Sequence, residues 1–325
     1  MASANLRYNY VIFGMTGYYE VAYRGIMYLD NVIYHPTLES LFRTKFGRLL
    51  LDITITSKVS LRYKKLIVRY VYHRITDIKF NNNKPVCIIL FNSYVLLCRK
   101  DFVNYIHHKF ERSKVVFYMQ DIVSSRKDLE IRRYIKEVDL ALSYDKGDAE
   151  RYGFWYYPTP FSYWKIPANN APESDIYYCG KGKERYQTII DVYKNCERMG
   201  LRCLFYVSGV PSSDQYHAPG IIYNTPISYE ENLMFVSKTR CILEVMQQGA
   251  DGFTPRLWES IIYDKHFLTN NSSIDTFAHY NPNFMHHISE IENISKELTT
   301  EVSYPDGIKS SLSPKNLLTF IETHL

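Results

Sequence analysis

The chain has 325 residues, which is long enough for two domains that each bury their own core. Hydrophobic residues make up 46% and charged residues 22%, which is ordinary for a globular protein and excludes a disordered one. A net charge of +5 is too small to indicate a nucleic-acid-binding protein by itself, but it suits a protein that handles anionic nucleotides or rests on an anionic membrane.

Short apolar strands alternate with helices in the first half of the sequence. We expect strands at Tyr8–Phe13, Asn31–Tyr34, Val86–Leu90, Val115–Tyr118 and Leu140–Ser143, and helices at Tyr18–Leu29 and Arg126–Glu137. Residues 49–79 are rich in Arg, Lys and Tyr, and their pattern is compatible with a loop followed by a helix. Strands separated by helices in this way indicate a parallel sheet.

Prolines clustered between Tyr156 and Ala171 interrupt this pattern, which then starts again. We expect strands at Asp175–Cys179, Arg202–Val207, Ile221–Tyr223, Cys241–Val245 and His266–Thr269, and helices at Arg185–Met199, Tyr229–Ser237, Pro255–Ile262 and Lys315–His324. The predicted fold class is therefore α/β, with two Rossmann-like, doubly wound domains over residues 1–160 and 161–325. Since ligands of such sheets bind at the carboxyl ends of the strands, we expect a ligand in a cleft that the two domains face.

The stretch from Asp251 to Glu259 reads as a glycine-containing loop that opens a helix. Pro255 suits the first helical turn, and the loop before it would present backbone amides to an anion. Arg256 and Glu259 are three residues apart and so share one helix face, where a guanidinium can pair with phosphate and a carboxylate can hold a ribose diol. Taken alone, the pair is better explained as an exposed ion pair on a capped helix.

This stretch resembles the donor-binding motif of GT-B glycosyltransferases, in which an acidic residue, a Gly-Phe or Gly-Leu pair and a later Glu open the helix that grips the nucleotide. The longer pattern, which continues through Lys265 to Asn271, is similar to bacterial transferases of surface-polysaccharide and lipopolysaccharide-core assembly. The resemblance implies donor contacts by Gly252, Phe253, Thr254, Arg256 and Glu259, and a catalytic acid at Asp251. Many retaining members have Glu at the position of Asp251, so the direct contact of this residue with the donor sugar is an open question.

A second candidate segment follows the strand at Asp175–Cys179. Gly180 permits a close backbone approach, and either Lys183 or Arg185 could neutralise phosphate charge. In the family that the chain resembles, this loop meets the diphosphate of the donor. A solvated basic turn is the alternative interpretation.

Other candidates concern catalysis and metals. Asp121 lies three residues after the strand at Val115–Tyr118, and it is our candidate for a catalytic base or an acceptor contact. Asp145 and Asp148 are expected to cap or stabilise turns. The histidine pairs at 107–108 and 286–287 lack the i,i+4 spacing of a helical metal site, and no Asp-x-Asp follows a strand. We therefore expect no metal and no cofactor, only a nucleotide sugar, with a UDP-sugar favoured, as co-substrate.

The leading hypothesis is a cytoplasmic, metal-independent glycosyltransferase, with retention of the anomer favoured, that uses a glycan or lipid-linked acceptor, in some contact with the inner face of the membrane. A nucleotide-sugar epimerase of the same fold and a non-catalytic carbohydrate- or nucleotide-binding protein are alternatives. The basic, Tyr-rich segment Leu61–Arg74 suits single-stranded nucleic acid, anionic lipid headgroups or plain solvent, and nucleic acid is the partner that we expect least.

Overall fold

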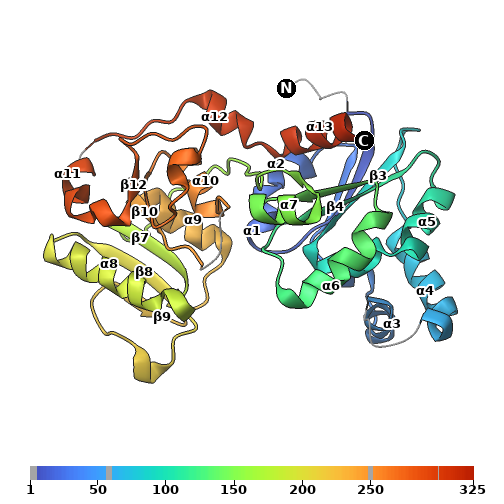
Figure 1. Cartoon of the computed structure of the whole chain (residues 1–325), viewed down its shortest axis with the longest axis horizontal. Coiled ribbons are helices and arrows are strands. Elements are labelled where there is room, and N and C mark those ends of the chain that lie inside the picture. The colour runs from blue at the N-terminus through green and yellow to red at the C-terminus, as the bar shows by residue number, and fades with distance from the viewer. Residues whose placement is uncertain (1–5, 56–60, 248–251, 299) are drawn as a thin grey trace. The chain divides into compact units, whose positions relative to one another are not determined.

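The computed structural model describes residues 6–55, 61–247, 252–298 and 300–325. The chain divides into two compact units, and each carries one six-stranded sheet whose strands are all parallel. Unit 1 comprises residues 1–162 and 313–325, and unit 2 comprises residues 163–312. The predicted fold class of two parallel α/β sheets is thus confirmed (Figure 1).

The sheet of unit 1 has the strand order β2-β1-β3-β4-β5-β6. Its strands are β1 (Asn9–Phe13), β2 (Val32–His35), β3 (Val86–Phe91), β4 (Lys114–Met119), β5 (Leu140–Ser143) and β6 (Trp155–Tyr156). Its α-helices are α1 (Tyr18–Ala22), α2 (Arg24–Met27), α3 (Lys45–Ile55), α4 (Leu61–Ile75), α5 (Lys100–Lys109), α6 (Ser125–Tyr134), α7 (Lys146–Tyr152) and α13 (Pro314–His324). Its 3₁₀ helices in the described residues are η1 (Leu38–Leu41), η2 (Asn92–Cys98) and η3 (Ile135–Glu137).

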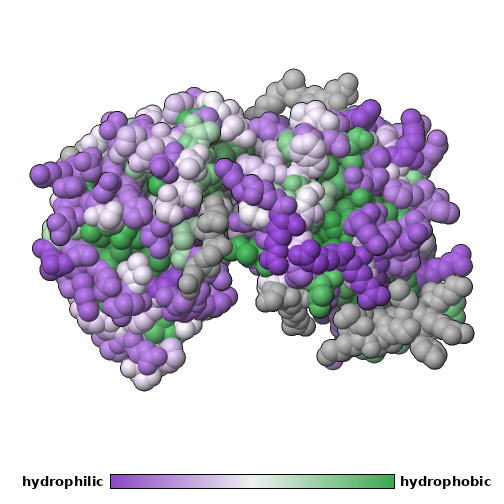
Figure 2. Space-filling view, in the orientation of Figure 1, coloured by the Kyte–Doolittle hydropathy of each residue, from purple (hydrophilic) through white to green (hydrophobic). Residues whose placement is uncertain are grey.

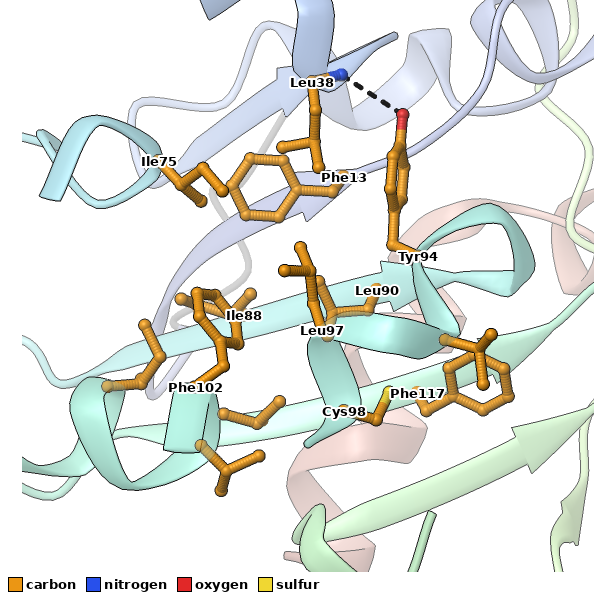
Figure 3. Packing of buried hydrophobic residues seen from close by; sticks show 14 of the residues in the cluster. Phe13, Leu38, Ile75, Ile88, Leu90, Tyr94, Leu97, Cys98, Phe102 and Phe117 are labelled. Atoms are coloured by element: carbon orange, nitrogen blue, oxygen red, sulfur yellow. Dashed lines mark hydrogen bonds between the residues drawn. The ribbon is translucent and has the colours of Figure 1, made fainter. Parts of the chain in front are cut away.

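Alternate residues of these strands feed two cores, one on each face of the sheet. Val11 and Phe13 point into the core under α3, α4 and α5, whereas Tyr10 and Ile12 point into the core under α2 and α13. Figure 3 shows part of the first core, where Tyr94 accepts a hydrogen bond from the backbone N–H of Leu38 at 3.2 Å. Burial of both faces explains why the strands are apolar along their whole length.

Helix α13 packs in unit 1, although our division of the sequence grouped it with residues 161–325. Leu317, Leu318 and Ile321 are fully buried in the core that contains Tyr10. The carboxylate of Glu322 also accepts a hydrogen bond from the Tyr10 hydroxyl at 2.9 Å. The apolar face of the helix therefore completes the first sheet, a long-range contact that a boundary drawn from local pattern misses.

The sheet of unit 2 has the strand order β12-β11-β10-β7-β8-β9. Its strands are β7 (Ser174–Lys181), β8 (Cys203–Ser208), β9 (Ile221–Tyr223), β10 (Thr239–Glu244), β11 (His266–Thr269) and β12 (Met285–His287). Its α-helices are α8 (Tyr186–Arg198), α9 (Tyr229–Lys238), α10 (Pro255–Ile262), α11 (Ile294–Glu297) and α12 (Asp306–Ser311). The 3₁₀ helices in the part of unit 2 that the structure describes are η4 (Lys183–Arg185), η5 (Ser212–Asp214), η6 (Ile274–Thr276) and η7 (Ile288–Asn293).

The second sheet is also covered on both faces. Ile176 and Tyr178 of β7 share a core with Ile189 and Val192 of α8. The residue between them, Tyr177, points to the other face, where its hydroxyl donates to Asn232 of α9 at 2.9 Å. The central strands β7 and β10 are hydrogen-bonded neighbours, so their carboxyl ends meet at one edge.

All ten strands predicted from the sequence are present, within about two residues at each end. The helix predicted at Tyr18–Leu29 is broken at Tyr23 into α1 and α2, and the segment left open at 49–79 forms α3 and α4. The sequence pattern did not indicate the short edge strands β6 and β12, which are two and three residues long. No helix in the described residues is both long enough and apolar enough to cross a bilayer.

Candidate functional site

The candidate site lies in unit 2, at the carboxyl ends of β7 and β10 and the start of α10. Gly180 lies near the end of β7, Glu244 is the last residue of β10, and Arg256 and Glu259 lie in the first two turns of α10. The structure therefore brings together four residues that are up to 79 positions apart in the sequence. Three of them, Gly180, Arg256 and Glu259, were sequence candidates.

Arg256 is held over the end of β7. Its Nη2 donates to the backbone carbonyl of Cys179, and its guanidinium lies 5.6 Å from the centre of the Tyr178 ring. Burial works against its charge, but the Tyr178 hydroxyl and the Glu259 carboxyl favour it, and the net effect raises the pKa of Arg256. The site thus holds a permanent, partly buried cation that has no carboxylate in direct salt-bridge contact among the described residues.

Gly180 is the residue that lets Arg256 come so close. A Cβ atom at this position would lie 2.9 Å from Nη2 of Arg256 and 2.7 Å from the hydroxyl oxygen of Tyr178. Any larger residue would therefore displace one of these two side chains. The close approach that we expected of this glycine is made by an arginine of the same site.

Glu259 is a buried carboxyl, only 4% exposed, between α10 and α9. Its Oε1 accepts hydrogen bonds from the Tyr229 hydroxyl at 2.5 Å and from Nδ2 of Asn232 at 3.3 Å. Burial raises the pKa of Glu259 to about 7, although both hydrogen bonds and Arg256 oppose this shift. The interpretation of Arg256 and Glu259 as an exposed ion pair is wrong, because Glu259 is buried and bonds to α9 instead.

Glu244 was not a candidate from the sequence, yet it organises the start of α10. It is 1% exposed, and its two carboxylate oxygens accept hydrogen bonds from the hydroxyls of Thr254 and, at 2.6 Å, Thr269. Burial raises its pKa, opposed by those two hydrogen bonds. The available signal was an acidic residue that follows the apolar run Cys241–Leu243, shortly before the loop that carries the motif.

Our expectation of an anion site concerned the amides of the loop at residues 249–254, of which 249–251 lie outside the described residues. The first amides of α10 itself are bonded at the start of the helix. Thr254 caps the helix, and its side chain accepts from the N–H of Arg256 at 3.3 Å. Its carbonyl accepts from the N–H of Leu257 at 3.1 Å, and Pro255 has no N–H. An anion at this helix would therefore meet the Arg256 side chain rather than these amides.

Phe253 and Gly252 fix the loop before α10. The Phe253 ring is 7% exposed and packs edge-on against Phe277, with a distance of 5.1 Å between the ring centres. Gly252 is buried, and its carbonyl accepts from Nδ2 of Asn271 at 3.4 Å. The side chain of Phe253 is thus a packing anchor, and a ligand contact of this residue would have to come from its backbone.

The two basic candidates of the β7–α8 loop differ from each other. Arg185 donates from Nη1 to the carbonyl of Val245 at 3.1 Å and from Nη2 to that of Lys181 at 2.8 Å, so it ties β7 to the chain after β10. Lys183 is exposed and has a left-handed backbone with φ of 43°. Of the two, Lys183 has the side chain that can move onto an anion at small cost.

Asp251 lies outside the described residues. Asp121 lies in unit 1, two residues beyond the end of β4, where its exposed carboxylate accepts from the N–H of Ile122 at 2.9 Å. Asp145 caps α7 by accepting from the N–H of Asp148 at 2.8 Å, and Asp148 accepts from the N–H of Val123 at 2.7 Å. The expectation that Asp145 and Asp148 stabilise turns is confirmed.

The described residues contain no cluster of three or more His, Cys, Asp or Glu side chains arranged to hold a metal ion. His107 and His108 lie in α5, where Nδ1 of His107 contacts the Ser113 hydroxyl. His286 lies in β12 and contacts His266 of β11, with 3.2 Å between Nε2 of His286 and Nδ1 of His266.

No protein-family model matches the sequence, and no curated protein is significantly similar to it. The structure has the same fold as a putative UDP-N-acetylglucosamine 2-epimerase from Listeria monocytogenes, with a TM-score of 0.52 and 10% identity over 98% of this chain and 96% of that one. Two further similar structures are an alpha-glucosyltransferase in complex with UDP-glucose and DNA containing an abasic site (TM-score 0.49, 11% identity, 97% of this chain and 93% of that one) and the glycotransferase of kitacinnamycin (TM-score 0.48, 8% identity, 98% and 100%).

Proposed function

We propose that this chain is a glycosyltransferase that moves a sugar from a nucleotide sugar, most simply a UDP-sugar, to a glycan or lipid-linked acceptor of bacterial surface-polysaccharide assembly. The observation that carries the proposal is the arrangement at the start of α10, where Arg256 and Glu259 lie at the carboxyl edge of the unit 2 sheet beside Gly180. A guanidinium and a buried carboxyl on one helix face suit a diphosphate and a ribose diol, respectively.

In this proposal Arg256 binds the diphosphate after its guanidinium group turns away from the carbonyl of Cys179. Lys183 adds a second positive charge from the β7–α8 loop, while Arg185 and Gly180 hold that loop in place. As the sugar leaves, negative charge builds up on the diphosphate, and these cations stabilise it electrostatically.

Glu259 is assigned the ribose hydroxyls, with Tyr229 and Asn232 fixing its orientation. Thr254, Gly252 and Phe253 set the path of the loop that leads into α10. For unit 1 we propose the acceptor side and assign Asp121 as the group that accepts the proton of the acceptor hydroxyl, because its carboxylate is exposed beyond the end of β4. We place the reaction in the cytoplasm.

A panel of UDP-, GDP-, CMP- and dTDP-sugars in a thermal-unfolding assay tests the donor assignment. A ligand present at 100 times its dissociation constant stabilises the folded state by about 2.7 kcal/mol, so one nucleotide should raise the melting temperature while the others do not. No shift with any member of the panel would contradict the proposal. The Asp121→Asn variant should show the same rise in melting temperature with the nucleotide sugar. It should no longer transfer the sugar to acceptors in an extract of bacterial glycans and glycolipids.

An epimerase is the second candidate, because the similar structure with a TM-score of 0.52 is a putative UDP-N-acetylglucosamine 2-epimerase. Both candidates predict binding of a nucleotide sugar, so the donor panel does not separate them. Proton NMR of a nucleotide sugar incubated with the protein and no acceptor does. Appearance of the 2-epimer would favour the epimerase, whereas an unchanged donor that is consumed only with an acceptor favours the transferase.

A further inference from the structure

Helices α3 and α4 of unit 1 pack side by side and use one face of each to cover the sheet (Figure 1). Leu51 of α3 and Val71, Tyr72 and Ile75 of α4 are buried in the core that contains Phe13. The opposite faces of the two helices have no covering element among the described residues, as the exposures of their side chains show. The composition of these outer faces is unusual for a protein surface.

Large hydrophobic side chains gather there. The outer faces carry Phe46 (68% exposed), Leu49 (53%), Leu66 (85%) and Tyr70 (48%). These are half of the eight large hydrophobic residues that are exposed in the described chain, and most of the surface seen in Figure 2 is hydrophilic. The spacings 46/49 and 66/70 place each pair on one face of its helix, so the apolar groups lie together rather than scattered.

Positive charge accompanies these side chains. Residues 43–75 contain nine Lys and Arg but one acidic residue, Asp52, whereas the whole chain has a net charge of only +5. Arg48 and Arg69 are exposed and flank the apolar pairs, at the positions next to Leu49 and Tyr70. Arg48 donates from Nε to the carbonyl of Phe42 at 3.2 Å. Arg74 differs in having an acidic partner, since it pairs with Asp77 at 3.7 Å besides donating to the carbonyl of Leu41.

We propose that this outer face binds the surface of an anionic lipid bilayer. The α3–α4 surface, as we call it, consists of Arg43, Lys45, Phe46, Arg48, Leu49, Leu66, Arg69 and Tyr70. Its cations complement acidic headgroups, and its aliphatic and aromatic groups enter the headgroup–acyl boundary, which is the pattern of interfacial helices. Single-stranded nucleic acid fits less well, because it is bound by stacking on aromatic faces, whereas two of the four apolar groups here are leucines.

The inference does not rest on the proposed function. It concerns unit 1 side chains, and the donor assignment concerns unit 2, so vesicle binding and nucleotide binding are separate readouts.

Flotation of the full chain with lipid vesicles tests the inference. We expect binding to vesicles of phosphatidylcholine with phosphatidylglycerol, and little to vesicles of phosphatidylcholine alone. Leu66→Ser should weaken vesicle binding roughly ten-fold, because it removes one aliphatic side chain that would be buried in the bilayer. Arg69→Gln should weaken it about five-fold, because it removes one positive charge near the anionic headgroups. Leu129→Ser is the matched control, because Leu129 is 75% exposed on α6 of the same unit, outside the α3–α4 surface.

All the substituted side chains are exposed, so thermal unfolding should be unchanged in each variant. The inference would be overturned if Leu66→Ser bound vesicles as tightly as the wild type. It would also be overturned if Leu129→Ser weakened vesicle binding as much as Leu66→Ser does. The absence of vesicle binding, with or without salt-dependent binding of a random single-stranded oligonucleotide, would overturn it as well.

Discussion

At the carboxyl ends of its strands, the sheet of unit 2 gathers Glu244, Arg256 and Glu259, whereas the equivalent edge of unit 1 gathers tyrosines. In unit 1, the hydroxyl of Tyr34 in β2 binds the backbone of Met15, which lies in the loop after β1. It donates to the carbonyl of Met15 at 2.8 Å and accepts from the N–H of Met15 at 3.2 Å. Burial raises the pKa of Tyr34, so its hydroxyl is neutral at ordinary pH. The two sheets share an all-parallel architecture, but the buried carboxylates at the unit 1 edge, Asp145 and Asp148, accept from backbone amides, whereas those of unit 2 lie near Arg256.

This difference shows that topology supplies a place for a ligand, while the side chains decide which ligand can occupy it. In unit 2, buried carboxyls are costly to ionise, and they persist because hydroxyl and amide groups bind them and Arg256 lies near. In unit 1, the carboxylates of Asp145 and Asp148 are used by backbone amides within the fold. We therefore expect nucleotide binding to respond to changes in unit 2 alone.

The largest effect is expected from Arg256→Ala. Loss of a charge-assisted contact with phosphate should weaken nucleotide-sugar binding about 100-fold, because a hydrogen bond to a charged group contributes roughly 1.5–3 kcal/mol. Isothermal titration calorimetry measures this change. Arg240→Ala is the matched control, since Arg240 is an exposed arginine of β10 in the same unit, and it should bind as wild type. Undiminished binding by Arg256→Ala would remove the phosphate role.

Glu259→Gln separates binding from stability. The pKa of Glu259 is raised from an ordinary 4.5 to about 7, so between these values the folded protein holds more protons than the unfolded chain. The free energy of unfolding therefore falls as pH rises through this window. The Glu259→Gln side chain does not ionise, so the variant avoids this loss of stability. It should be more stable than the wild type at pH 8 by on the order of 1–2 kcal/mol. Its affinity for the nucleotide should drop about ten-fold.

Urea denaturation at pH 5 and pH 8, with Glu150→Gln as an exposed control in unit 1, measures the effect on stability. Equal stabilisation by both amides, or none by Glu259→Gln, would show that Glu259 is not the buried acid that the geometry describes.

A pair of glycine substitutions compares the two edges directly. At Gly180 a Cβ meets Nη2 of Arg256 and the hydroxyl oxygen of the buried Tyr178, so Gly180→Ala should displace the arginine and weaken nucleotide binding about ten-fold. At Gly14 a Cβ would lie 2.2 Å from the hydroxyl oxygen of Tyr34, which is fixed by Met15. Gly14→Ala should therefore destabilise unit 1 by about 1–3 kcal/mol and leave nucleotide affinity unchanged. The reverse pattern would place the ligand in unit 1.

The smallest effect concerns His266 and His286, which lie at the edge of unit 2 formed by β11 and β12. Nε2 of His266 donates to the carbonyl of Thr300 at 3.0 Å, so in a neutral His266 ring Nδ1 accepts from Nε2 of His286. Burial lowers the pKa of both from 6.5, so the unfolded chain takes up protons first and stability falls as pH drops below about 6.5. His286→Gln should reduce this acid sensitivity by roughly 1 kcal/mol between pH 7 and pH 5 in thermal unfolding. This slope has the opposite sign to that of Glu259, and an unchanged acid sensitivity would contradict it.

The sequence predicts the strands well because both sheets are buried on two faces, which makes strands such as Val86–Phe91 continuously apolar. It does not predict the partner of α13, because Leu317 and Ile321 show that a helix is amphipathic but not which sheet it covers. Within the site, local spacing indicates that Arg256 and Glu259 share a helix face. The contacts of these residues with Cys179 and Tyr229 depend on long-range packing, as does the role of Glu244.

Hydrogen–deuterium exchange with and without the nucleotide sugar that stabilises the protein tests the central claim most directly. Exchange reports the local stability of each segment, so it locates the bound ligand on the chain. We predict slower exchange at residues 178–186 and 252–260 of unit 2, and unchanged exchange at residues 14–17 and 119–123 of unit 1. Protection confined to those unit 1 segments would contradict the assignment of the donor site to unit 2.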